Sequence, residues 1–239
     1  MIKIYKLIHA LITCASLFIM SCNNEGSPVL NTHIERPKTE KVAKLEDSQL
    51  LEEIKIGPQI WSAKNLSVST FRNGDPILQV KTNEDWLKCQ NTATPAWCYY
   101  NNDSSNRNRY GKLYNWFAVD DSRGLAPSGW QIPRSAEWLI LLDYLGGQDD
   151  AGRKLKAISG WDKDGNGTNI SGFGCMPGGR RSNDGMGEFY SHGSIGQWWS
   201  STESTTTASW ALLLIAETHS AIMLSCNKPD GLSVRCIRR

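Results

Sequence analysis

The tryptophans of this 239-residue chain are confined to one part of it, because all ten lie between Trp61 and Trp210. A segment so rich in large aromatic side chains has to bury most of them in a shared core. Neither a repeat nor a second linker interrupts the segment, and its length suits one sizeable core. We therefore expect one folded domain over residues 54–239.

The first residues predict export. Two lysines precede an apolar stretch over residues 7–20, which is too short to span a bilayer. The stretch ends in IMSC (residues 19–22), a sequence typical of a bacterial lipobox. We predict a lipoprotein signal peptide over residues 1–21 and acylation of Cys22, which would anchor the chain to a membrane without a transmembrane helix. An ordinary secretory signal with an incidental cysteine is the alternative.

The segment between the signal and the domain predicts a flexible tether. Residues 22–53 are polar and contain prolines but no aromatic residues. Loss of the two signal lysines would lower the formal charge from +2 to 0, so net charge favours no nucleic-acid partner. We expect the protein in the cell envelope, lipid-anchored at the outer membrane, with its domain on either the cell surface or the periplasmic face.

Hydrophobic periodicity predicts few helices. Residues 134–147 (RSAEWLILLDYLGG) contain apolar side chains at helical spacing and a Gly-Gly stop, and residues 149–161 predict a shorter helix. Leu113, Trp116 and Phe117 would share one face of a third helix.

Extended segments predict strands at both ends of the domain. Residues 54–66 indicate a strand, a Gly-Pro turn and a strand. Residues 209–217, 220–226 and 232–239 predict three consecutive strands of an antiparallel meander. The expected class is α+β, with two or three helices, short antiparallel strands and long Gly/Asn-rich loops.

Five cysteines lie in the domain, an odd number for an oxidising compartment. A Cys89–Cys98 disulfide could close a short loop, and a Cys226–Cys236 disulfide could link neighbouring strands. Cys175 would then be a buried free thiol. The alternative is that all five are thiols. No CxxC spacing is present, so neither a zinc site nor a thioredoxin-like redox pair is indicated.

Four segments in order resemble one family: residues 110–138, 172–181, 197–203 (QWWSSTE) and 231–236 (GLSVRC). The chain is similar to the Fibrobacter succinogenes major paralogous domain, which is common in lipoproteins and secreted proteins of Bacteroidetes and Fibrobacteres. The resemblance implies a C-type-lectin-like fold with the formylglycine-generating enzyme group as a neighbour.

The helix predicted over residues 134–147 departs from that family at its first residue. The family usually has Thr there, with Glu three residues later in a capping box. This chain has Arg134 with Glu137 retained, and an arginine side chain cannot accept a backbone N–H bond. We expect Ser135 to cap the helix one residue later.

Two groups of residues are candidates for ligand or metal binding. Trp198 and Trp199 would have at least one side chain in the core, and a role as a ligand platform is the alternative. Asp162, Asp164 and Asn166 alternate like the start of an EF-hand loop, although the twelfth position from Asp162 is a phenylalanine. A looser Ca²⁺ site and a simple Asp/Asn/Gly turn are both open.

The C-terminal strands predict a recognition surface. Residues 211–216 are apolar at positions of both parities, so either both faces of the sheet are covered or one presents an apolar patch. We expect Leu212, Leu214, Ile222 and Leu224, or the set of opposite parity, to contact a ligand.

Catalytic motifs are not found: the sequence contains no GxSxG elbow and no HxxxH or HExxH pair. The resemblance would place a reactive cysteine pair near the C-terminus, where only Cys226 and Cys236 lie, and the residues around them do not match the enzyme group. We predict a non-enzymatic, lipid-anchored protein that recognises a protein or glycan ligand. The alternatives are a formylglycine-generating-like oxidase and a passive structural or assembly component of the cell surface.

Overall fold

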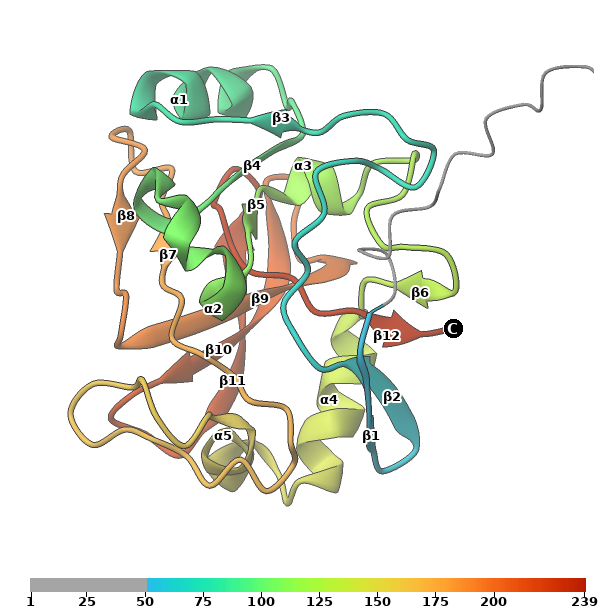
Figure 1. Cartoon of the computed structure of the whole chain (residues 1–239), viewed down its shortest axis with the longest axis vertical. Coiled ribbons are helices and arrows are strands. Elements are labelled where there is room, and N and C mark those ends of the chain that lie inside the picture. Colours follow the sequence, from blue (N-terminus) through green and yellow to red (C-terminus); the bar gives the residue numbers. More distant parts are fainter. Residues whose placement is uncertain (1–50) are drawn as a thin grey trace, which may run out of the picture. The chain divides into compact units, whose positions relative to one another are not determined.

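The computed structural model describes residues 51–239 (Figure 1). The predicted signal peptide, Cys22 and most of the tether lie outside these residues. Strand β1 (Glu53–Ile56) begins one residue before the predicted start of the domain, and Leu51 packs against a core cluster. The last residues of the predicted tether therefore belong to the folded unit. No helix within residues 51–239 has the length and apolar character needed to cross a membrane.

A four-stranded antiparallel sheet joins the start of the domain to its end. Its strand order is β1, β2 (Gln59–Ser62), β12 (Ile237–Arg238) and β6 (Trp130–Gln131). The predicted strand–turn–strand over residues 54–66 is confirmed by β1 and β2, with Gly57 in the left-handed region at φ +56°. Figure 1 shows the C-terminus beside these N-terminal strands.

The central sheet contains the longest strands, in the order β11 (Ala221–Asn227), β10 (Ala208–Ile215) and β9 (Ile195–Glu203). Both pairings are antiparallel, and a β-bulge lies between Ser209 and Ala211 of β10. The predicted meander is therefore half right. Residues 232–239 do not form its third strand; they cross to the other sheet as β12, and β9 takes the place beside β10.

Two small sheets and five helices complete residues 51–239. One sheet has the order β3 (Leu78–Gln79), β4 (Ala96–Cys98), β5 (Leu113–Tyr114), and the other pairs β7 (Arg180–Arg181) with β8 (Phe189–Tyr190). The helices are α1 (Asn83–Asn91), α2 (Arg107–Tyr110), α3 (Trp116–Val119), α4 (Ser135–Tyr144) and α5 (Gln148–Leu155), with single 3₁₀ turns at Tyr100–Asn102 and Ser104–Asn106.

Both predicted long helices form as α4 and α5, but α5 ends at Leu155 and not near residue 161, and the five helices exceed the two or three that were predicted. Helix α4 ends before Gly146 and Gly147, both with positive φ, as the Gly-Gly stop predicts. Helix α1 was not predicted; Thr82 caps it by accepting the Asp85 N–H at 3.1 Å. Leu113 lies in β5, so it does not share a helical face with α3.

The start of α4 is capped by another strand and not by Ser135. Glu137 Oε2 accepts the backbone N–H of Arg134 at 2.6 Å, which supplies half of a capping box. The other half is missing because arginine has no acceptor atom. The backbone N–H of Ser135 instead donates to Thr202 Oγ1 of β9 at 3.1 Å.

Nine of the ten tryptophans are buried, and Trp210 is partly exposed. Eight of their indole N–H groups donate hydrogen bonds: Trp61 donates to Gln59 two residues away, and the other seven donate mostly to backbone carbonyls that are distant in the sequence. The donors are Trp61, Trp86, Trp97, Trp116, Trp138, Trp161, Trp198 and Trp199. A buried indole removes a large apolar area from water, and its N–H hydrogen bond holds the acceptor segment in position. These side chains therefore stabilise a loop-rich fold.

Four buried cations have a similar role. Lys112, Lys156, Arg181 and Arg235 are each at most 3% exposed, and none has a carboxylate partner within residues 51–239. Each lies over an aromatic ring, for example with Lys112 Nζ 3.5 Å from the Trp97 centroid. Lys156 Nζ also donates to three backbone carbonyls, at 2.6–3.2 Å.

Candidate functional site

Trp198 and Trp199 are part of the core. Both side chains are 0% exposed, although they are adjacent in β9. They point to opposite faces of the sheet and join different hydrophobic clusters. Trp198 Nε1 donates to Asn65 Oδ1 at 2.8 Å, and Trp199 Nε1 donates to the Tyr114 carbonyl at 2.8 Å. This fits the core interpretation and removes both from a ligand-contacting surface.

The four residues named for a recognition surface on the C-terminal strands do not share one exposed face. The opposite-parity set stays open, because Leu213 and Ile215 are half-buried and Leu213 pairs with Ile222. Leu212 and Leu214 are 0% exposed and pack in one core cluster. Leu224 is on the other face of the sheet and packs partly against the second cluster, so of the four predicted residues only Ile222 is exposed, at 40%. The prediction placed residues from both faces of the sheet in one set. The register, which pairs Leu212 with Met223, could not be inferred from the sequence.

The loop with Asp162, Asp164 and Asn166 has the geometry of a turn. Asn166 Oδ1 accepts the Trp161 N–H at 3.0 Å, so this oxygen already has a partner. Asp164 has a positive φ of 56°, which Asp tolerates in tight turns. Within residues 51–239, no three His, Cys, Asp or Glu side chains are grouped as metal ligands. These contacts favour the turn over the Ca²⁺ site.

All five cysteines of the domain are free and buried, and neither predicted disulfide is present. Burial raises the pKa of the Cys226 and Cys236 thiols to about 12. Both therefore stay protonated at neutral pH, whereas reactive cysteines need an accessible thiolate. This chemistry opposes the oxidase alternative at Cys226 and Cys236.

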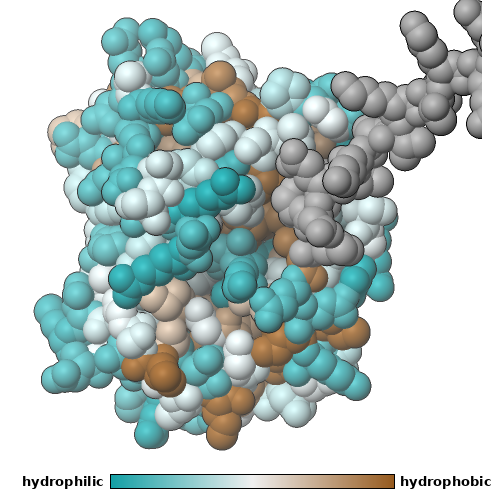
Figure 2. Space-filling model, viewed as in Figure 1, coloured by the Kyte–Doolittle hydropathy of each residue, from teal (hydrophilic) through white to brown (hydrophobic). Residues whose placement is uncertain are grey.

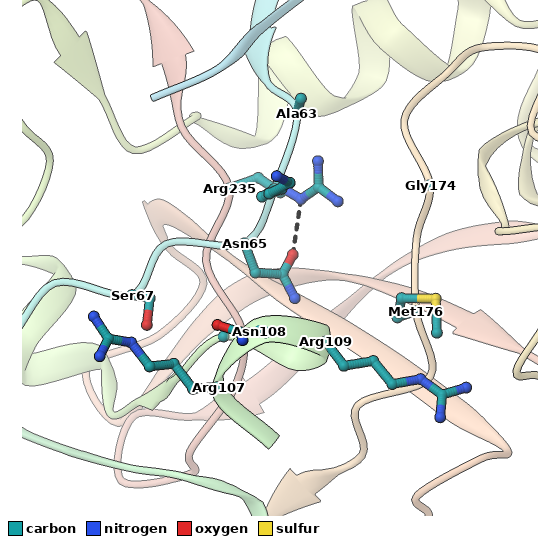
Figure 3. Close-up of a pocket in the computed structure, with 11 residues that line it drawn as sticks. Ala63, Asn65, Ser67, Arg107, Asn108, Arg109, Gly174, Met176 and Arg235 are labelled. Carbon is teal, nitrogen blue, oxygen red and sulfur yellow. Dashed lines mark hydrogen bonds between the residues drawn. The ribbon is translucent and has the colours of Figure 1, made fainter. Parts of the chain in front are cut away.

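A basic pocket of about 430 Å³ lies elsewhere, between the segment after β2, helix α2 and the loop that precedes β7. Figure 3 shows Arg107 and Ser67 at one end, Arg109 and Met176 at the other, and Asn65 with Arg235 between them. Among the described residues, no aspartate or glutamate lines it. Its lining consists of Ala63, Lys64, Asn65, Ser67, Arg107, Asn108, Arg109, Gly111, Gly174, Met176 and Arg235.

The floor of the pocket is a rigid polar network. Arg235 donates to Asn65 Oδ1 at 2.7 Å, to the Ser62 carbonyl at 2.7 Å and to the Phe173 carbonyl at 2.9 Å. Asn65 also accepts the Trp198 indole N–H and donates to the Tyr110 carbonyl at 2.8 Å. Burial lowers the pKa of Arg235 to about 10, so its guanidinium stays charged at neutral pH. The network fixes one positive charge beneath the pocket.

Two exposed arginines supply the free charge. Arg107 and Arg109 form no ion pair within the described part of the chain, and neither side chain has a hydrogen-bond partner there. They leave α2 in different directions and reach opposite ends of the pocket (Figure 3). Lys64, the fourth cation, pairs with Glu52 at 3.2 Å. Ser67 Oγ is buried beside Arg107 and has no hydrogen-bond partner among residues 51–239.

This arrangement suits an elongated ligand with more than one negative group. Each free guanidinium can bind a carboxylate, sulfate or phosphate through two N–H groups, and their divergence prevents both from holding one small anion. The surface over α2 is strongly hydrophilic (Figure 2). This site was not predicted from the sequence, because the polar segment over residues 101–109 (NNDSSNRNR) shows no hydrophobic periodicity; the alternating arginines Arg107 and Arg109 were the available signal.

Comparisons with known proteins give one match. The sequence model of the Fibrobacter succinogenes major domain matches residues 54–238. No curated protein and no solved structure matches the chain. The matched range includes every strand from β2 to β12 and the whole basic pocket. The chain belongs to the Fibrobacter succinogenes major domain family.

Proposed function

We propose that this protein is a lipid-anchored component of the cell envelope whose domain recognises an acidic ligand, without catalysing a reaction on it. The observation that supports recognition is the basic pocket, where Arg107 and Arg109 face a lining with no acid and have no ion-pair partner in residues 51–239. The favoured ligand is a glycan with carboxylate or sulfate groups. An acidic protein segment is the other ligand with suitable charge.

The anchor and the fold are part of the same proposal. The lipobox sequence at residues 19–22 supports acylation of Cys22 and attachment to the outer membrane. Small, mostly antiparallel sheets, three helices of eight to ten residues and extended loops, with β2 and β12 joining the two ends, support a C-type-lectin-like fold. Fold alone does not assign a ligand, so the pocket is the basis for the functional proposal.

Binding of the full chain to polygalacturonate, with its methyl ester as the uncharged counterpart, tests the proposal. We expect binding of the acid and not of the ester, with an affinity that falls as salt rises. Replacing both arginines, Arg107→Gln with Arg109→Gln, should weaken binding at least about tenfold. The matched control is Lys55→Gln with Lys81→Gln, which removes the same charge from exposed positions that do not line the pocket.

Two results would overturn this proposal. One is equal binding of acid and ester; the other is equal loss of binding in the arginine and lysine double variants, because only net charge would then matter. Binding of polyglutamate but not of polygalacturonate would assign the pocket to acidic proteins. Protease treatment of intact cells, with a periplasmic marker as the control, would show on which face of the outer membrane the ligand is met.

A further inference from the structure

A second pocket, of about 340 Å³, lies where loops from five places in the chain meet. It is formed by the end of α1, by α3, by the β7–β8 loop, by the β9–β10 turn and by the residues after β11. Figure 1 shows α1, α3 and the β7–β8 hairpin toward the same end of the domain. The lining residues are Gln90, Phe117, Asn183, Thr206, Thr207, Asn227, Lys228 and Pro229.

This pocket presents no free charge. Of the described residues that line it, only Lys228 is charged, and its Nζ is paired with Glu203 and lies 4.5 Å from the Trp116 centroid. The ammonium side chain is only 12% exposed. An anionic ligand would therefore compete with a carboxylate that is already in place, so the chemistry here differs from that of the basic pocket.

Two neighbouring carboxamides leave a donor and an acceptor for a ligand. Asn227 Nδ2 donates to Asn183 Oδ1 at 3.3 Å, and within residues 51–239 the Asn183 amide nitrogen and the Asn227 amide oxygen have no other partner. Asn183 is held in place because its backbone N–H donates to Asp230 Oδ1 at 3.0 Å, and Asp230 is only 2% exposed. The Asn183 backbone is thus held beside Asn227 before any ligand binds.

An apolar ring and further polar groups lie around this pair. The Phe117 side chain is partly exposed at the pocket, whereas its neighbour Trp116 is buried. The side chains of Gln90 and Thr206 have no hydrogen-bond partner in the described residues. A sugar ring offers what these groups need: adjacent hydroxyls, each able to donate and accept, and a C–H face that can lie on an aromatic ring.

We propose that this pocket binds a neutral sugar residue, with adjacent hydroxyls bonded to Asn183 and Asn227 and one ring face on Phe117. This site does not depend on the acidic ligand proposed for the basic pocket, and it requires no metal ion. A peptide would also use the carboxamides, but it would not need the partly exposed aromatic ring beside them.

Saturation-transfer difference NMR on the full chain tests the site with cellohexaose, maltohexaose and chitohexaose as probes. We expect at least one probe to bind in EDTA, with transfer strongest to the ring C–H protons. Phe117→Ala should weaken binding about tenfold, and Asn227→Leu should do the same. The control Tyr144→Ala removes an aromatic side chain that is 60% exposed on α4 and should leave binding unchanged.

The proposal is overturned if none of the three probes binds at about 10 mM. It is also overturned if a folded Phe117→Ala variant, checked by its unfolding midpoint, binds as well as the parent. The Arg107→Gln with Arg109→Gln variant separates the two pockets: it should lose polygalacturonate and keep the neutral oligosaccharide. Loss of both ligands in that variant would place them in one site and contradict the second pocket.

Discussion

Replacing Arg181 should destabilise the domain strongly, because this residue ties three segments together. Arg181 is 0% exposed and donates to the Gly187 carbonyl at 2.8 Å and the Thr82 carbonyl at 2.7 Å, with longer bonds to the Val80 carbonyl at 3.3 Å and Asn83 Oδ1 at 3.1 Å. Its guanidinium also lies 4.7 Å from the Trp86 and Phe189 ring centroids.

The expected loss of unfolding free energy follows from the hydrogen-bond acceptors that lose their donor in Arg181→Met and from the cation–π contacts that the substitution removes. Each buried carbonyl that loses its partner costs about 1–3 kcal/mol, and each cation–π contact is worth about 0.5–2 kcal/mol. Removal of a buried charge returns part of this cost, because its desolvation is no longer required. We expect a net loss of about 3–4 kcal/mol. With a urea m-value of about 2 kcal/mol/M for a domain of this size, the midpoint should fall by about 1.5–2 M.

Urea unfolding followed by tryptophan fluorescence measures this loss. Arg181→Lys should be intermediate, since an ammonium keeps the charge but cannot reach all four acceptors. Arg153→Met, an exposed arginine on α5, is the control and should change the midpoint little. An Arg181→Met variant within about 1 kcal/mol of the parent would refute the reasoning, because the buried charge would then cost as much as its bonds provide.

Four further predictions concern Asp230, Arg134, the Asp162–Asn166 loop and Cys22. Burial raises the pKa of Asp230 from 3.8 to about 6; the native state therefore keeps a proton that the unfolded state releases, and stability should fall as pH rises through this window. Asp230→Asn should remove that dependence and gain about 2 kcal/mol at pH 7, as urea midpoints across pH would show, and an unchanged pH profile would contradict it. Arg134→Thr should complete the capping box and stabilise the domain by about 0.5–1 kcal/mol; an unchanged or lower melting midpoint would count against it. Calcium should not raise the melting midpoint relative to EDTA, and a rise that is lost in Asp162→Ala with Asp164→Ala would restore the metal site. Cys22→Ala should abolish palmitate labelling and release the protein from the membrane fraction, and retention of both would refute the lipobox assignment.

Local patterns predicted the elements that depend on local chemistry. The helical period and Gly-Gly stop located α4, and the Gly-Pro turn located β1 and β2. Long-range strand pairing was harder to predict from the sequence. Strand β10 pairs with β9, whereas residues 232–239 supply β12, which pairs with β2 and β6. Strand partners and register depend on the whole fold, and a shift of one residue moves a side chain to the other face, so the sequence could not show that Leu212 and Leu214 are buried.

The candidate site was missed for a similar reason. Arg107 and Arg109 lie in a polar segment without periodicity, and they become a site only because Asn65 and Arg235 lie beneath them from opposite ends of the domain. For Trp198, the sequence correctly indicated that the side chain lies in the core. Its hydrogen-bond partner Asn65 is 133 residues away and could not be inferred. Contacts at this separation have no local signature.

The most direct test of the proposed function is an NMR spectrum of the arginine Nε–H groups during titration with polygalacturonate. We expect the Arg107 and Arg109 signals to shift with ligand, and those of Arg181 and Arg72, whose N–H groups already bond to carbonyls, not to shift. If the Arg107 and Arg109 signals do not shift while the ligand binds, recognition occurs elsewhere and the basic pocket is not the site.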